Sequence, residues 1–118
     1  MLSNNKFSGA YYLAGYSIEL ALKSVICRVF KSETIPDKKF VNSIHSHNLV
    51  ELMNLSGLRI QFEASMKSAP QLQTFWTIVT KWSENSRYEV KSYEEASRLI
   101  EAICDNQNGI LTWITKYW

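Results

Sequence analysis

Glu19 and Lys23 are the charged residues inside the most apolar segment of the chain, residues 11–26. Their i, i+4 spacing puts both side chains on one face of a helix, in the orientation that favours an ion pair. One interpretation is a solvent-exposed pair that contributes about 0.3–0.5 kcal/mol. The other places the pair beside the rings of Tyr12 and Tyr16, at the edge of a polar groove that binds a ligand.

Two histidines, His45 and His47, flank Ser46 just ahead of a second apolar segment. His47 is placed either to cap the helix that follows or to hydrogen-bond to a neighbouring helix. An imidazole titrates near neutral pH, so it suits acid–base chemistry when a partner group lies close. The sequence predicts no metal site here, because no cysteine, aspartate or third histidine lies nearby at ligand spacing. No cofactor is predicted either.

Arg87 and Tyr88 are adjacent in a segment without helical periodicity. A guanidinium there could bind a phosphate with two parallel hydrogen bonds, and the tyrosine ring could stack on a base. In the alternative, Arg87 closes the loop by bonding to a carboxylate such as that of Glu19, and Tyr88 fills the core. The chain has no glycine-rich phosphate loop and no GxSxG nucleophile motif.

Length and composition indicate one globular domain that spans residues 1–118. Its net charge of +2 is far weaker than that of a dedicated duplex-DNA binder, so composition neither requires nor excludes nucleic acid. Cys27 and Cys104 have no CxxC spacing and are expected to be free, buried thiols. No apolar run is long enough for a membrane span and no signal peptide is recognisable, so we expect a cytoplasmic protein without membrane partners.

The elements that position these residues are predicted to be helices, because β-branched alternation is nearly absent. Helical periodicity covers about residues 6–31, 47–55 and 58–82, and a Ser92–Glu95 capping box begins a last helix. Residues 32–46 are expected to connect the first two helices, and residues 83–91 to form an ordered loop. The apolar register after the box continues past Gly109, which predicts one long helix. The fold class is therefore all-α, an up-and-down bundle of four to five helices with two long spine helices.

Four motifs occur in an order that resembles the HEPN superfamily of helical domains. Residues 11–23, Tyr-Tyr-Leu-Ala-Gly-Tyr-Ser-Ile-Glu-Leu-Ala-Leu-Lys, are similar to the family's opening helix with its Glu-x-x-x-Lys. Residues 47–52, His-Asn-Leu-Val-Glu-Leu, are similar to its His-x-Leu-x-x-Leu. Trp82 followed by Arg87-Tyr88, and the closing Ile-Leu-Thr-Trp-Ile at residues 110–114, complete the set.

The resemblance implies a small helical bundle that forms homodimers and is often paired with a minimal nucleotidyltransferase in a toxin–antitoxin system. Many members of the family are metal-independent endoribonucleases whose signature is an arginine followed four to six residues later by a histidine. This chain lacks that signature, because neither histidine lies at that distance after an arginine. The family's ribonuclease activity is therefore not carried over to this chain.

Three functional hypotheses follow. The first is a HEPN-like module that binds a nucleotide, RNA or a protein partner in a groove edged by Glu19, Lys23, His47, Arg87 and Tyr88. The second is a divergent endoribonuclease that uses His47 as general acid or base, with Arg87 or Lys23 stabilising the developing phosphorane charge. The third is a structural or assembly protein in which these residues only maintain helix packing.

Overall fold

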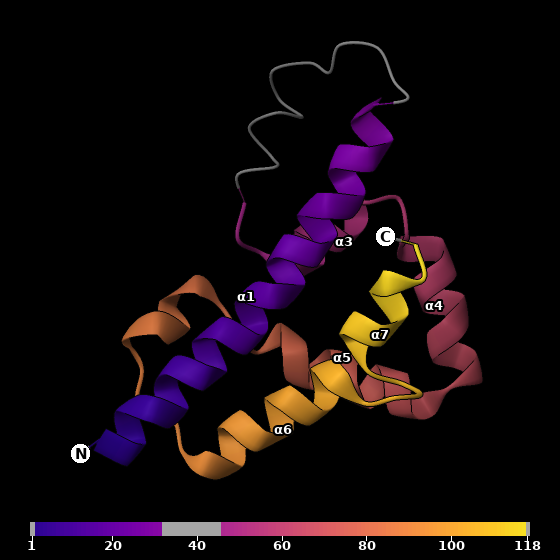
Figure 1. The fold of residues 1–118 in the computed structure, drawn as a ribbon. Coiled ribbons are helices and arrows are strands. Elements are labelled where there is room, and N and C mark those ends of the chain that lie inside the picture. Colours follow the sequence, from indigo (N-terminus) through magenta and orange to yellow (C-terminus); the bar gives the residue numbers. More distant parts are fainter. Residues whose placement is uncertain (1, 32–45, 118) are drawn as a thin grey trace.

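A computed structural model describes residues 2–31 and 46–117, with side chains over residues 6–28, 46–86 and 88–117 (Figure 1). Within these ranges it contains six α-helices, one 3₁₀ helix and no strand, which confirms the all-α prediction; one more helix is present than expected. The elements are α1 (Leu2–Lys31), α3 (Leu49–Leu55), α4 (Arg59–Ser68), α5 (Pro70–Thr80), η1 (Glu84–Tyr88), α6 (Tyr93–Cys104) and α7 (Ile110–Thr115).

Helix α1 is the central element, and it crosses the whole molecule in Figure 1. It packs against α3, η1, α6 and α7, so its apolar surface is covered on more than one side. That breadth explains why its apolar residues extend beyond the single stripe of a surface helix. The buried hydrophobic residues of α1 are Tyr11, Ile18, Ala21, Leu22, Val25 and Ile26.

The helix ends follow local chemistry that is readable in the sequence. The side chain of Asn48 caps α3 by accepting a hydrogen bond from the amide of Glu51 at 3.1 Å, so His47 does not cap this helix. Gly57 follows α3 with a φ of 78°, the left-handed conformation that favours glycine. Pro70 occupies the first turn of α5, and the capping box predicted at Ser92 is present at the start of α6.

The predicted second long helix is wrong, because the chain leaves the helix after Cys104 and starts α7 at Ile110. The Asp105 carboxylate accepts hydrogen bonds from the amides of Gln107 at 3.2 Å and Asn108 at 2.8 Å, which closes a turn in place of the helix. The apolar register survives the turn because α7 packs back against α1, α5 and α6. Preserved register was therefore not proof of a continuous helix.

Two smaller expectations also change. Residues 84–88 of the predicted loop form the 3₁₀ helix η1, in which the amide of Ser83 donates to the hydroxyl of Ser86 at 3.2 Å. Cys27 and Cys104 are free, as predicted, but both are exposed, so their predicted burial is wrong. Residues 32–45 of the predicted connection, including His45, lie outside the described residues. In the described part of the chain, no helix has the length and apolarity that crossing a membrane requires.

Candidate functional site

The Glu19 carboxylate lies inside the protein, with only 1% of the side chain exposed. Lys23 Nζ donates to its Oε2 at 3.1 Å, and His47 Nδ1 lies 3.1 Å from Oε1 and 3.0 Å from Oε2. A carboxylate removed from water is costly unless it is paired and hydrogen-bonded. The two donors meet that requirement. The interpretation of Glu19 and Lys23 as a solvent-exposed pair is therefore wrong, and the expected bond from His47 to a neighbouring helix is confirmed.

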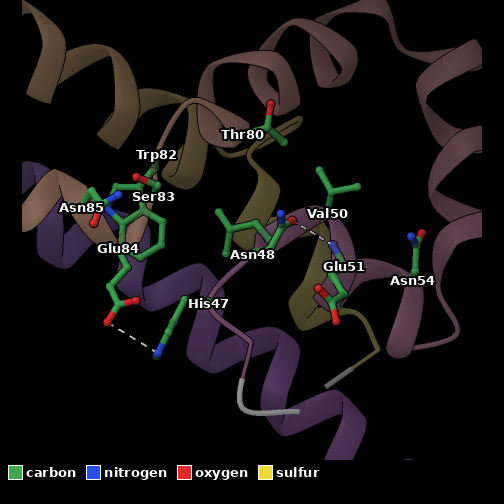
Figure 2. A pocket seen from close by; sticks show the side chains of 11 residues that line it. His47, Asn48, Val50, Glu51, Asn54, Thr80, Trp82, Ser83, Glu84 and Asn85 are labelled. Carbon is green, nitrogen blue, oxygen red and sulfur yellow. Dashed lines mark hydrogen bonds and ion pairs between the residues drawn. The ribbon is translucent and has the colours of Figure 1, made fainter. Parts of the chain in front are cut away.

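His47 connects α1 to η1 through its two ring nitrogens. An ionised carboxylate only accepts hydrogen bonds, so the network assigns a hydrogen to the Nδ1 that faces Glu19. The other nitrogen, Nε2, lies 3.6 Å from the Oε1 of Glu84, and Figure 2 shows the two side chains pointing toward each other. The His47 side chain is 41% exposed. Glu19 thus fixes the ring from inside, while Nε2 stays accessible from outside.

A pocket of about 540 Å³ opens beside this ring. It lies between α3 with its leading segment, the end of α5 and η1 (Figure 2). Most of its lining side chains carry amide, hydroxyl or carboxylate groups, and no lysine or arginine lines it in the described part of the chain. The lining residues are His47, Asn48, Leu49, Val50, Glu51, Asn54, Thr80, Trp82, Ser83, Glu84 and Asn85. We call this space the His47 pocket.

Tyr12 and Tyr16 were predicted to lie at the edge of the site, and Tyr12 contacts one wall of the pocket. Tyr12 stacks on Tyr16 with ring centroids 5.9 Å apart, and Trp82 Nε1 donates to the carbonyl oxygen of Tyr12 at 3.2 Å. The Tyr12 ring also contacts the Trp82 ring, with centroids 5.8 Å apart, and Trp82 is one of the walls of the His47 pocket. Neither tyrosine is itself among the residues that line the pocket, and neither is Lys23.

Arg87 belongs to η1, three residues after Glu84, and its side chain lies outside the described residues. Tyr88 is 77% exposed and does not line the pocket, so it does not fill the core. Sequence reasoning missed most of the lining, because residues such as Asn54 and Asn85 are single polar positions at helix ends with no motif around them. The available signals were the motif at residues 47–52, to which five of the lining residues belong, and the polar segment 83–85 ahead of Arg87.

A second pocket, of about 400 Å³, includes Ser65, Gln107 and Lys116 in its lining and shares no residue with the His47 pocket. No group of three or more histidine, cysteine, aspartate or glutamate side chains that could hold a metal occurs among the described residues.

A separate polar cluster surrounds Tyr11, two turns before Glu19 on α1. Lys91 Nζ lies 4.7 Å from the centre of the Tyr11 ring, 3.6 Å from Glu89 and 3.5 Å from Glu95. Burial raises the pKa of Tyr11, against the opposing effect of the Lys91 charge. Desolvation lowers the pKa of Lys91, but attraction to Tyr11, Glu89 and Glu95 outweighs it and the net pKa is raised. This cluster holds the segment before α6 against α1 and does not touch the His47 pocket.

Comparison of the chain with protein-family models, with curated proteins and with solved structures found no match in any of the three. The functional conclusions below therefore rest on the residues and their geometry.

Proposed function

We propose that the chain is a HEPN-like binding module that takes a nucleotide in the His47 pocket. The observation that carries this proposal is the imidazole of His47, which a buried carboxylate holds at the edge of the His47 pocket. Binding sites for small molecules commonly measure 300–1,000 Å³ and place a few fixed polar groups on an otherwise preformed wall. At about 540 Å³, the His47 pocket falls in that range.

The lining suits the edge of a nucleobase. Asn54 and Asn85 each carry both a donor and an acceptor, and such amides can pair with the hydrogen-bonding edge of a base. Thr80 and Ser83 add hydroxyl groups that serve in either role. These side chains come from the region of three separate elements, α3, α5 and η1, of which α3 and η1 pack directly on α1. The size and this mixture of groups favour a small polar ligand over an extended protein interface.

Calorimetric titration with AMP, CMP, GMP and UMP tests the proposal. We expect saturable binding of at least one nucleotide below about 1 mM, and roughly tenfold weaker binding after His47→Ala or Asn85→Ala. Gln107→Ala, in the second pocket, is the matched control and should bind as the parent protein does. No saturable binding to any of the four nucleotides, or equal weakening by the control, would overturn the proposal.

A divergent endoribonuclease is the second candidate, and the fixed orientation of His47 favours it. A histidine whose Nδ1 is held by a carboxylate can use Nε2 as a general base, with Arg87 as the proposed stabiliser of charge on the phosphate. Incubation with a labelled short RNA tests this activity. Cleavage that disappears in both His47→Ala and Arg87→Ala would support the endoribonuclease, whereas cleavage that survives in His47→Ala would exclude it.

We also propose that a second copy of the chain packs on the outer face of α1. Leu13 and Leu20, seven residues apart on this face, are 65% and 48% exposed. The smaller Ser17 and Ser24 alternate with them at the 3–4 spacing of a helical seam. Light scattering should report a dimer that Leu20→Glu converts to a monomer, while Ile60→Glu on α4 leaves it intact. A parent protein that is monomeric throughout would contradict the homodimer and would leave this face to another protein, such as the nucleotidyltransferase implied by the resemblance.

A further inference from the structure

Two hydrogen-bond acceptors face each other at the mouth of the His47 pocket. When the ring of His47 is neutral, Nδ1 carries the hydrogen that points to Glu19 and Nε2 is an acceptor; a protonated ring instead forms an ion pair with Glu84. The Glu84 carboxylate is an acceptor too, and its Oε1 lies 3.6 Å from Nε2. This separation exceeds the usual N–H···O distance of about 2.7–3.2 Å. The pair therefore favours a donor group that offers one hydrogen to each acceptor.

We propose that the ligand of the His47 pocket carries an exocyclic amino group, as adenine and cytosine do, and that this group donates to His47 Nε2 and to Glu84 together. The inference rests on the proposed function, because it names the class of nucleotide that the same site selects. An amino group has two hydrogens, so it satisfies both acceptors at once. A carbonyl oxygen in its place, as in hypoxanthine or uracil, puts a third acceptor against the two and is disfavoured.

The charge of the surrounding wall acts in the same direction. Glu51 and Glu84 both line the pocket, and none of its described lining residues is a lysine or arginine. The Glu51 carboxylate accepts a hydrogen bond from the hydroxyl of Ser46 at 3.2 Å, which holds it at the pocket wall. Hydrogen bonds from a neutral donor to a carboxylate are stronger than those between two neutral groups. A donor on the ligand is therefore favoured over an acceptor at this edge.

The two acceptors also differ in how firmly they are held. His47 is fixed by the buried Glu19 carboxylate, whereas the Glu84 side chain is 54% exposed and belongs to the short helix η1. Replacing Glu84 therefore changes the hydrogen-bonding character of the site without removing a buried group. Glu84→Gln keeps the shape of the side chain and adds an amide NH₂ that can donate to a carbonyl. The variant should lose the preference for amino bases while it retains the pocket.

Titration with two matched nucleotide pairs tests the inference. AMP is compared with IMP, and CMP with UMP, at about pH 8, above the pKa of about 6.5 of a free imidazole. We expect each amino-bearing nucleotide to bind roughly tenfold more tightly than its oxo partner. In Glu84→Gln the ratio within each pair should fall toward one, and in Gln107→Ala it should not change. Thermal melting of each variant verifies that it is folded.

The outcomes separate this inference from the proposed function. Equal binding of AMP and IMP, and of CMP and UMP, would overturn the amino-group preference while leaving a nucleotide site in place. A preference that persists unchanged in Glu84→Gln would overturn the role of Glu84. Absence of binding to AMP, CMP, GMP and UMP alike would overturn the proposed function itself, and the inference with it.

Discussion

Replacing His47 with alanine removes one of the two donors that compensate the buried Glu19 carboxylate. After this change the carboxylate keeps only Lys23, whose Nζ bonds to Oε2. Its Oε1, 3.1 Å from His47 Nδ1 in the parent protein, loses that donor. Because Glu19 is 1% exposed in the parent protein, its carboxylate depends on these two donors in place of water. The substitution should therefore lower the free energy of unfolding by more than the loss of a surface contact would.

The magnitude follows from burial. Hydrogen bonds to charged groups contribute about 1.5–3 kcal/mol, and breaking a fully buried ion pair costs about 3–5 kcal/mol. His47 is 41% exposed and Lys23 is 23% exposed, so solvent screens part of the interaction and the lower range applies. We expect His47→Ala to cost about 2 kcal/mol. That is a large share of the roughly 5–15 kcal/mol by which single domains are stable.

A double-mutant cycle measured by urea denaturation isolates the pair. His47→Ala, Glu19→Gln and the double variant should give a coupling energy of about 1.5–3 kcal/mol. The matched control is the cycle of His47 with Glu84, an exposed pair 3.6 Å apart that should couple by less than about 1 kcal/mol. Equal coupling in the two cycles, or none between His47 and Glu19, would refute the reasoning that burial of Glu19 makes this contact strong.

Two other predictions concern helix packing and helix capping. Gly15→Ala sets a methyl group against the Trp82 ring and should lower the free energy of unfolding, measured by urea denaturation, by about 1–3 kcal/mol. Gly9→Ala has open space around the added methyl group and should raise that free energy by up to about 1 kcal/mol. Equal effects of the two substitutions would contradict the contact between Gly15 and Trp82. A hydrogen bond from the amide of Ser92 lowers the pKa of Glu95 below its ordinary value of 4.5. Its stabilising effect is therefore present above pH 4.5 and is lost as the pH falls through the lowered pKa. The melting temperature of Glu95→Gln should be lower than that of the parent protein above pH 4.5, and the two should converge in acid. A difference in melting temperature that stays constant with pH would argue against this cap.

The sequence predicted the parts of the fold that depend on local chemistry. Apolar periodicity identified α1 with its end at Lys31, and the capping box at Ser92 placed the start of α6. The break before Gly109 was missed because the apolar register continues across it, and only the side chain of Asp105 reveals the turn. Local hydrogen bonding of this kind competes with a helix without changing its hydrophobic pattern.

The candidate site was predictable only where spacing within one helix defined it. The i, i+4 relation of Glu19 and Lys23 indicated their ion pair, which is present. Their burial, and the contact of Glu19 with a histidine 28 residues later, depend on how α3 and η1 pack on α1. The contact of Glu84 with His47 was missed for the same reason, because an exposed glutamate at the start of a short helix has no distinguishing pattern in the sequence.

The most direct test of the central claim is a long-range ¹H–¹⁵N NMR spectrum of His47, recorded with and without AMP. The account predicts that Nδ1 is the protonated nitrogen in the free protein, since it donates to Glu19. It further predicts that the Nε2 signal shifts as AMP is added, while the backbone amide of Gln107, in the second pocket, stays unchanged. A hydrogen on Nε2 alone in the free protein, or an Nε2 signal that does not respond to AMP, would contradict it.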